Sequence, residues 1–153
     1  QSTIKLIGEN LATENREWRV GITDSHLVYK NHISKYASYL LTLKNTNSIS
    51  TSSGDEKHYF YRDNYYHHII DPLTGYPNQN RFAVTAVTAN AMYADIVTTA
   101  LMSMDIKETK EFLNTLFAQG INVEVFIQDK NDDGVKVIAT NNIKKLFSLI
   151  NNL

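Results

Sequence analysis

Residues 65–77 read Tyr-Tyr-His-His-Ile-Ile-Asp-Pro-Leu-Thr-Gly-Tyr-Pro, and this segment holds both prolines of the chain. Pro72 fixes its own φ and disfavours the helical conformation at the residue before it. Gly75 then allows a positive φ that most residues avoid. The segment therefore predicts a strand over residues 65–70 that is followed by a tight turn over residues 71–75.

Two adjacent histidines, His67 and His68, lie in this predicted strand. Side chains alternate in direction along a strand, so the two imidazoles should point to opposite faces and should not bind one metal ion together. An Asp-Pro-x-x-Gly turn and a histidine on a strand are both common in proteins without an active site there. Taken alone, the segment favours a structural interpretation, and chemistry is suggested only when residues 90–104 are considered with it.

The composition excludes several classes of protein. The chain has 153 residues, which is enough for one domain with a sizeable core. Its 15 basic and 16 acidic residues nearly cancel, which argues against a nucleic-acid-binding surface. There is no cysteine, and hence neither a disulfide framework nor a thiolate site. No apolar run approaches the ~20 residues of a membrane span, and no signal peptide is recognised in these residues.

Alternating apolar and polar residues predict strands over much of the chain. The expected strands cover residues 2–7, 18–23, 36–43, 58–62, 65–70, 82–88, 121–128 and 135–139. Helices are expected over residues 91–104 after an N-cap at Asn90, over residues 105–119 with a cap at Asp105 and a stop at Gly120, and from Asn141 to about residue 150. The inner face of the second helix is expected to hold Phe112, Leu113, Leu116 and Phe117. Loops or turns are expected at residues 24–34, 63–64 and 129–134. We therefore expect a single α+β domain over residues 1–153, an antiparallel sheet with two to three helices packed on one face.

Residues 48–55 read Ser-Ile-Ser-Thr-Ser-Ser-Gly-Asp, and their small polar composition favours a flexible surface loop. The functional alternative is a segment whose backbone approaches a phosphate or a ribityl chain closely. Successive N–H groups in such a turn can form an anion-binding nest. Residues 129–134 resemble the start of a calcium-binding loop, but no glutamate closes that loop, so we interpret them as a solvated turn.

The predicted helix over residues 91–104 is apolar almost all round, which indicates a buried helix. Asp95 and Thr99 are the exceptions, and they share one face because they are four residues apart. A carboxylate in an apolar setting costs several kcal/mol unless it is compensated. The compensation could be the nearby helix N-terminus, a hydrogen bond to Thr99, or a divalent cation such as magnesium, which prefers a few hard oxygen ligands with water and phosphate oxygens. With a histidine and a small-residue segment nearby, these groups match the needs of phosphoryl transfer.

Three segments taken together and in order resemble the ApbE family. They are Ser52-Ser53-Gly54-Asp55, then His68-Ile69-Ile70-Asp71-Pro72-Leu73-Thr74-Gly75, and then Ala94-Asp95 with Thr99-Ala100. Residues 18–22 are similar to a strand of the family in the same region. The resemblance covers nearly the whole chain, which looks like the C-terminal half of a family member, and it implies a T-fold-like α+β architecture.

Members of this family are FAD:protein FMN transferases. The resemblance implies that FAD is bound as a substrate together with Mg²⁺, that its pyrophosphate is broken, and that FMN is attached to a threonine of a target protein with release of AMP. It implies that Asp95 and Thr99 are magnesium ligands, which makes Asp95 a catalytic residue. It implies that His68 is the catalytic base that deprotonates the acceptor threonine.

The resemblance also implies a set of residues that bind the flavin nucleotide. Ser53 and Gly54 are implied to lie against it, and Asp71, Thr74 and Gly75 to complete the cofactor-binding segment by shaping the turn that holds the histidine. Family members are mostly exported lipoproteins that are anchored to the membrane through an N-terminal lipidated cysteine. The resemblance therefore implies an extracytoplasmic location, at the cell surface or in the periplasm, and no nucleic-acid partner.

Two alternatives to the transferase stay open at this point. The same residues could split FAD into FMN and AMP with water as the acceptor, as a magnesium-dependent FAD pyrophosphatase. A non-catalytic flavin-binding or protein-binding lipoprotein domain is the other alternative. Because whole family members are about twice as long as this chain, we expect the isolated chain to show weak or no transferase activity.

Overall fold

The computed structural model describes residues 2–5, 17–25, 37–44, 47–55, 57–62, 64–132, 134–145 and 147–149. Every strand pair within these residues is antiparallel. The largest sheet has five strands in the order β1 (Ser2–Lys5), β4 (Ser48–Ser53), β7 (Arg81–Thr88), β8 (Val123–Asn131) and β9 (Gly134–Ala139). A second sheet has the order β10 (Phe147–Leu149), β3 (Ala37–Lys44) and β2 (Glu17–Thr23). The strands β5 (His58–Tyr61) and β6 (Asn64–His67) form a separate hairpin.

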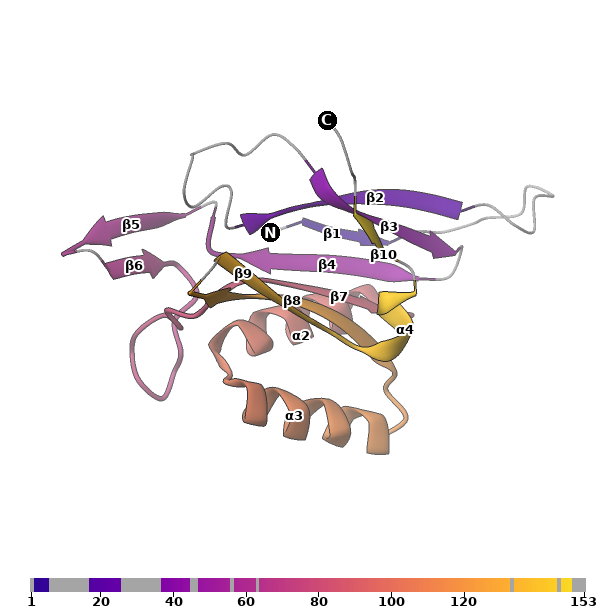
Figure 1. Cartoon of the computed structure of the whole chain (residues 1–153). Coiled ribbons are helices and arrows are strands. Elements are labelled where there is room, and N and C mark those ends of the chain that lie inside the picture. The colour runs from indigo at the N-terminus through magenta and orange to yellow at the C-terminus, as the bar shows by residue number, and fades with distance from the viewer. Residues whose placement is uncertain are drawn as a thin grey trace.

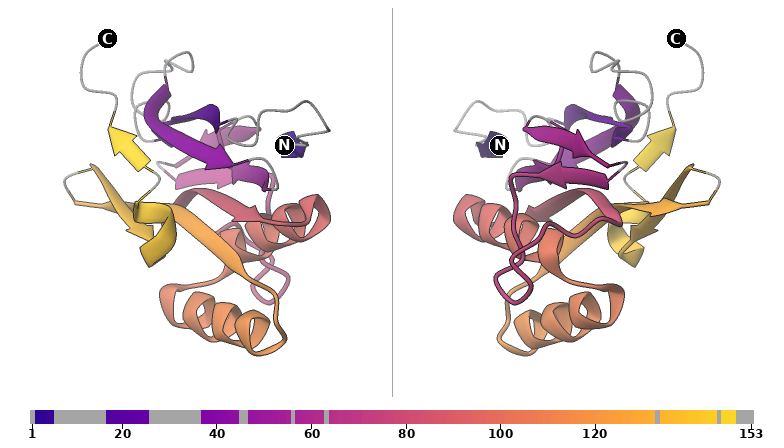
Figure 2. Two further views of the ribbon diagram at one scale, coloured as in Figure 1. Left: turned by 90° about the vertical axis from the view of Figure 1, so that its right-hand side faces the viewer. Right: turned by 90° about the vertical axis from the view of Figure 1, so that its left-hand side faces the viewer.

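The elements stack in layers around the five-stranded sheet (Figure 1). The helices α2 (Ala91–Ser103) and α3 (Ile106–Ala118) lie on one side of this sheet, and the second sheet lies on the other side (Figures 1 and 2). The short helix α4 (Asn141–Lys144) contacts β8. The α+β class expected from the sequence is therefore confirmed. Among the helices described, none has the length and apolar character needed to cross a membrane.

A separate apolar core fills each side of the five-stranded sheet. Toward the second sheet, the buried residues are Ile22, Leu41, Leu43, Ile49, Val87, Phe126 and Ile143. Toward the helices, they are Val84, Ala86, Val97, Leu101, Met102, Val125 and Ile127. Strand β7 contributes to both cores, and all of its 8 residues are buried. A strand covered on both faces explains why apolar residues run through β7 instead of alternating strictly with polar ones.

The two long helices begin at the caps that the sequence predicts. Asn90 accepts a hydrogen bond from the N–H of Met92 at the start of α2. Asp105 and Glu108 form a reciprocal capping box at the start of α3. Gly120 has a φ of 77°, which ends the second helix with a left-handed residue as expected.

The prediction of a flexible loop over residues 48–55 is wrong. Residues 48–53 form β4, which pairs with β1 on one side and β7 on the other. Ser48, Ser50 and Ser52 are buried, and the helix α2 packs against this strand. Small side chains allow the helix to approach the strand closely, and the hydroxyls of Ser50 and Ser52 bond to residues of α2. A composition that suggests a loop is therefore what this helix–strand contact requires.

Other predictions about element ends and faces also need correction. The strand expected over residues 65–70 ends at His67. The strands β8 and β9 are longer than expected, because β8 continues to Asn131 and β9 begins at Gly134. The last helix ends at Lys144, because Phe147–Leu149 pairs with β3. The helix α2 is not buried all round, since Met92 is 61% and Ile96 52% exposed. Phe117, expected inside, is 71% exposed. The loop expected over residues 24–34 lies outside the described residues from residue 26 onward, as does Asp63 of the expected turn.

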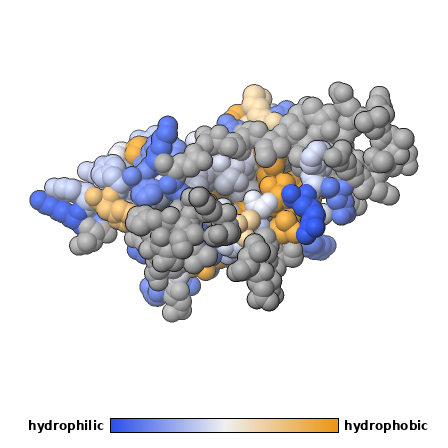
Figure 3. Space-filling view, turned by 90° about the horizontal axis from the view of Figure 1, so that it is seen from above, coloured by the Kyte–Doolittle hydropathy of each residue, from blue (hydrophilic) through white to orange (hydrophobic). Residues whose placement is uncertain are grey.

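The β5–β6 hairpin projects from one end of the molecule (Figure 1). Its aromatic side chains Tyr59, Phe60 and Tyr61 are exposed, and the rings of Tyr59 and Tyr66 stack with centroids 5.1 Å apart. Seen from above, this end shows hydrophobic and hydrophilic side chains side by side (Figure 3). The dense aromatic residues of this region therefore stabilise the hairpin largely through cross-strand ring contacts.

Candidate functional site

Asp95 and Thr99 of α2 lie against serines of β4. The Ser50 hydroxyl donates a hydrogen bond to Asp95 Oδ1 over 3.1 Å. The Ser52 Oγ lies 3.4 Å from the Thr99 Oγ1, and the Thr99 hydroxyl donates to the backbone carbonyl of Asp95 over 3.0 Å. The Asp95 carboxylate is half-buried, and the Ser50 hydroxyl of β4 supplies a hydrogen bond that compensates it. Two segments more than 40 residues apart in sequence are thus joined by polar contacts.

The oxygen donors on this helix face suit magnesium. Asp95 and Thr99 lie one helical turn apart on α2. Asp95 is half-buried and Thr99 is exposed, so a ligand in solvent can reach both side chains. Within the described residues, no group of three or more His, Cys, Asp or Glu side chains could hold a metal ion. Magnesium often keeps several waters and takes one or two protein carboxylates plus phosphate oxygens. The donor set therefore fits an ion that is held jointly with a phosphorylated ligand.

The end of β4 carries the predicted nucleotide-binding residues Ser53 and Gly54. The Gly54 N–H donates to the Phe82 carbonyl over 3.0 Å, and the Asp55 N–H donates to the Ser53 Oγ over 3.0 Å. These two N–H groups are already engaged inside the protein, so they do not form the anion nest considered from the sequence. Burial raises the pKa of the Asp55 carboxyl. Hydrogen bonds from Ser25 and Ser53 lower this pKa and so offset part of the effect of burial.

A close contact explains the glycine at position 54. A Cβ atom at Gly54 would lie 2.6 Å from the Tyr65 hydroxyl oxygen and 3.0 Å from the His67 Cβ and Cδ2. Real Cβ atoms do not approach other atoms to 2.6 Å. The glycine is therefore required by the packing of β6 against the end of β4, whether or not it also contacts a nucleotide.

The predicted turn after the histidines is present. Asp71 Oδ1 accepts from the Leu73 N–H over 2.9 Å, and its Oδ2 accepts from the Thr74 hydroxyl over 3.0 Å. The Gly75 N–H donates to the Asp71 carbonyl over 2.9 Å, and Gly75 has a φ of 75°. Asp71, Thr74 and Gly75 thus hold the turn together, as an Asx-type turn with a left-handed glycine.

The two histidines have opposite environments, as their alternation predicts. His67 is 3% exposed, and burial lowers its pKa. His68 is exposed, its N–H donates to the Lys57 carbonyl over 3.1 Å, and its Nδ1 lies 3.4 Å from the same carbonyl oxygen. An exposed imidazole on a turn can accept a proton from an approaching hydroxyl group.

The structure places Thr99 of the candidate metal-binding pair and the buried His67 at neighbouring parts of β4. Thr99 lies against Ser52, and Gly54, which lies against His67, follows two residues later. Two residues span about 7 Å of a strand. The imidazole of His68 makes no direct hydrogen bond with Asp95 or Thr99 within the described residues, so a ligand would have to bridge them.

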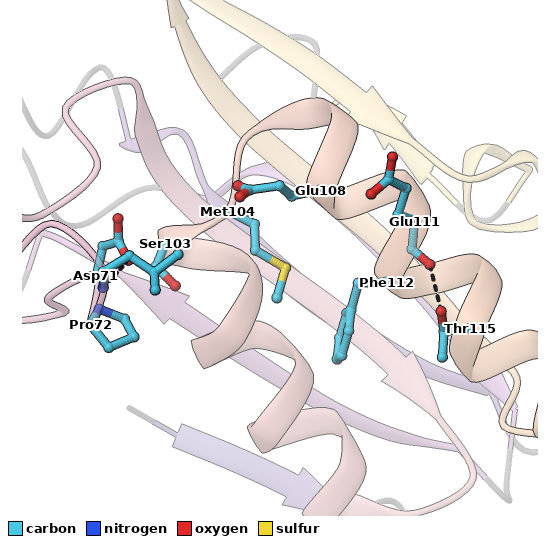
Figure 4. Close-up of a pocket in the computed structure, with 9 residues that line it drawn as sticks. Asp71, Pro72, Ser103, Met104, Glu108, Glu111, Phe112 and Thr115 are labelled. Atoms are coloured by element: carbon cyan, nitrogen blue, oxygen red, sulfur yellow. Dashed lines mark hydrogen bonds between the residues drawn. The ribbon is translucent and has the colours of Figure 1, made fainter.

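A pocket of about 370 Å³ opens between the turn and α3. Its lining residues are Asp71, Pro72, Leu73, Ser103, Met104, Glu108, Glu111, Phe112 and Thr115. Figure 4 shows Asp71 and Pro72 on one side and Glu108, Met104 and Phe112 on the other. The carboxylates of Asp71 and Glu108 already accept hydrogen bonds from the turn and the capping box. The pocket thus adjoins the turn after His68 and does not include Asp95 or Thr99.

One buried ion pair was missed from the sequence. Arg81 donates to both oxygens of Asp129, from Nε over 2.8 Å and from Nη2 over 3.2 Å, and also to the Leu101 carbonyl and the Thr109 hydroxyl. The interpretation of residues 129–134 as a solvated turn is therefore wrong at Asp129, which is 9% exposed. Arg81 ties β7 and β8 to α3 and to the C-terminal part of the helix that carries Asp95. The sign of a buried ion pair in the sequence was the position of Arg81, directly before the apolar strand expected over residues 82–88.

Comparisons with known proteins agree with this architecture. The model of the ApbE family matches residues 2–126. A relative from Vibrio cholerae, named FAD:protein FMN transferase, is 37% identical over 99 residues, which cover 63% of this chain and 28% of the relative. The crystal structure of an ApbE protein from Thermotoga maritima has a TM-score of 0.68 and 22% identity over 94% of this chain and 42% of that chain. The flavin transferase ApbE from Vibrio cholerae has a TM-score of 0.60 and 26% identity over 84% of this chain and 37% of that chain.

Proposed function

Because the chain belongs to the ApbE family, we propose that it forms part of a FAD:protein FMN transferase. Since the chain spans only 28% of the length of the Vibrio cholerae relative, the activity is proposed for the full-length protein that contains these residues. We further propose that residues 1–153 form one α+β domain. We expect the isolated chain to transfer FMN weakly or not at all.

One observation carries the proposal. The serine-rich segment and the Asp95–Thr99 pair, which the resemblance assigns to one site, contact each other through the Ser50–Asp95 and Ser52–Thr99 pairs. The third segment is attached to the same strand, because Gly54 lies against His67, the neighbour of His68. These contacts support a shared site that is built at the border between α2 and β4.

In the proposed reaction, the threonine hydroxyl oxygen of a target protein forms a new bond to the FMN phosphorus of FAD. The P–O bond to the AMP portion breaks, and AMP leaves with the bridging oxygen. His68 takes the hydroxyl proton, for which its exposed imidazole is suited. Atoms balance, because FAD and the acceptor hydroxyl give the FMN phosphoester, AMP and one proton.

Asp95 and Thr99 would hold Mg²⁺ through their oxygen atoms. A bound magnesium ion would neutralise charge on the pyrophosphate as the P–O bond breaks. Ser50 donates to the Asp95 carboxylate and so fixes its orientation toward the helix border. Asp71, Thr74 and Gly75 hold the turn that follows His68, and Ser53 and Gly54 lie at the end of β4 where the nucleotide would approach.

The exposure of His68 also favours a second candidate, the pyrophosphatase, in which water replaces the threonine hydroxyl. The residues and the bond that breaks would be the same, and free FMN would be the product. Product analysis with and without an acceptor protein distinguishes the two reactions. We also propose, from family membership alone, that the full-length protein is an extracytoplasmic lipoprotein.

The test uses the full-length protein with FAD, magnesium and the membrane fraction of the organism that makes it. We expect magnesium-dependent release of AMP and flavin fluorescence on a protein band in denaturing gels. Both should fall by at least about a hundredfold in Asp95→Asn, whereas Asp132→Asn, at an exposed carboxylate on the β8–β9 turn, should behave as wild type. Unchanged AMP release in Asp95→Asn, or turnover without magnesium, would overturn the proposed function.

A further inference from the structure

The buried imidazole of His67 lies where the chain leaves β6 and where it returns 11 residues later. Its Nε2 is 3.2 Å from the carbonyl oxygen of Asn78, and its Nδ1 is 3.3 Å from the backbone nitrogen of Ile69. Figure 1 shows the chain between β6 and β7 as a loop that closes on itself. The ring therefore joins the outgoing and the returning ends of this loop.

These two contacts define the protonation state of the ring. A carbonyl oxygen only accepts hydrogen bonds, so Nε2 must carry the proton that is donated to Asn78. The Ile69 N–H only donates, so Nδ1 must present its lone pair. Both contacts can be made only by a neutral imidazole with its proton on Nε2. An imidazolium would direct a second N–H at the Ile69 N–H and lose that bond.

The surroundings hold the ring in place. Gly54 leaves room for the Cβ and Cδ2 of His67, which a side chain at that position would displace. The ring of Tyr65 lies 5.7 Å away between centroids. At the far end of the contact, the Asn78 side chain donates to the Met104 carbonyl over 3.3 Å, directly after α2. The closed loop is thereby attached to the C-terminal end of the helix that carries Asp95 and Thr99.

We propose that His67 is a positioning residue, a neutral imidazole that clasps residues 69 and 78 and so fixes His68 relative to α2. This inference rests on the proposed function, in which His68 receives the proton of the acceptor hydroxyl. Within the described residues, the backbone N–H of His68 donates to the carbonyl of Lys57, the residue before β5, and the imidazole clasp supplies a second attachment, to the loop and to α2. A base that shifts by about 1 Å can lose on the order of a hundredfold in rate, which makes such an attachment significant.

The clasp should open when His67 is protonated. The titratable groups that face it are His58, its partner in the β5–β6 register, and the neighbouring His68, and both disfavour a positive charge on the ring. Tyr65 contacts the ring from β6, and burial acts in the same direction as the two histidines. The neutral form is thus the native form at neutral pH.

The test compares His67→Gln and His67→Leu with wild type. Glutamine keeps one donor and one acceptor, whereas leucine keeps bulk and loses both. We expect the Ile69 amide to exchange with solvent about tenfold faster or more in His67→Leu and near the wild-type rate in His67→Gln. In the full-length protein, His67→Leu should lower kcat for FMN transfer about tenfold or more with little change in KM for FAD, and His67→Gln should restore most of the rate. His58→Gln is the matched control, because His58 pairs with His67 across the hairpin and, within the described residues, its ring hydrogen-bonds to the Asp55 carbonyl alone. This variant should change neither the Ile69 exchange rate nor kcat.

A second measurement keeps the inference open to disproof even where His67→Leu fails to fold. The ¹⁵N chemical shifts of the wild-type His67 ring at about pH 7.5 should show a neutral ring protonated on Nε2. A proton on Nδ1, a charged ring, or wild-type Ile69 protection in a folded His67→Leu would overturn the clasp. Absence of magnesium-dependent FAD turnover in wild type would instead overturn the proposed function, while the tautomer and the Ile69 exchange would still decide the role of His67 in the loop.

Discussion

The hydroxyl of Ser50 on β4 and the carboxylate of Asp95 on α2 form a hydrogen bond of 3.1 Å. This contact joins a strand of the central sheet to a polar position of a helix that is apolar on its inner face. It also couples the placement of the candidate metal ligand to the sheet.

The first prediction concerns the coupling between Ser50 and Asp95. In a double-mutant cycle of Ser50→Ala and Asp95→Ala, we expect a coupling of about 1 kcal/mol in the free energy of unfolding, because a partly buried hydrogen bond to a carboxylate is lost. Urea denaturation measures it. Ser103→Ala is the control, since that hydroxyl bonds only to the Ala100 carbonyl of its own helix, and it should be additive with Asp95→Ala. A coupling of zero for the first pair would contradict the contact.

The second prediction concerns the close approach at Gly54. Gly54→Ala should destabilise the protein by about 1–3 kcal/mol, because the new methyl group overlaps the Tyr65 hydroxyl and the His67 ring. Tyr65→Phe removes the nearest overlapping atom and should recover part of this loss in the double variant. Gly75→Ala meets no atom within 4 Å and is strained only by its φ of 75°, so Tyr65→Phe should not affect its cost. Thermal denaturation of the three single and two double variants checks this, and an equal effect of Tyr65→Phe on both alanine variants would refute the steric explanation.

The third prediction concerns the buried ion pair of Arg81 and Asp129. Arg81→Met or Asp129→Leu alone should cost about 3–5 kcal/mol of stability, because each leaves a buried charge without its partner. The double variant should cost less than either single one, since no uncompensated charge remains. By comparison, Lys107→Ala should change stability by less than about 0.5 kcal/mol, because it removes an exposed pair with an N–O distance of 4.0 Å. Denaturant titrations test the order of these effects, and a double variant less stable than both singles would contradict it.

The fourth prediction concerns pH. Burial lowers the pKa of His67 below its usual 6.5, so the native state binds fewer protons than the unfolded state between the lowered pKa and 6.5. This contribution to stability is fully present above 6.5 and is lost as the pH falls through the native pKa. His67→Gln, which does not titrate, should therefore flatten the rise of the unfolding free energy with pH over that interval. Parallel pH profiles of the two proteins would show that His67 is not responsible.

The sequence predicts the parts of the fold whose signals are local. Asn90 and Asp105 are capping residues whose bonds form within a few positions, and the structure has both as expected. The turn after His68 is also local, because Pro72 and Gly75 restrict the backbone there. Such signals depend on few neighbours, so tertiary contacts do not override them.

The parts that were wrong depend on distant partners. The serines of β4 are typical of a loop until α2 covers them, and only the fold supplies that cover. Asp129 and Arg81 are 48 residues apart, so nothing in the acidic turn alone indicates the ion pair. Phe147 lies in an apparent helix by its neighbours, but β3 offers it an edge to pair with. In each case a neighbour from elsewhere in the chain decides the outcome.

The burial of β7 at all its positions has a consequence for how such a protein can change over time. The strand leads through Asn90 directly into α2, so the helix that carries Asp95 and Thr99 is attached to a rigid part of the core. The residues Leu73 and Tyr76, by contrast, are 86% and 64% exposed on the loop after His68. Substitutions at these two positions would alter an exposed surface and leave the core untouched. We would therefore expect relatives to differ at the positions of Leu73 and Tyr76 sooner than in the buried strand β7.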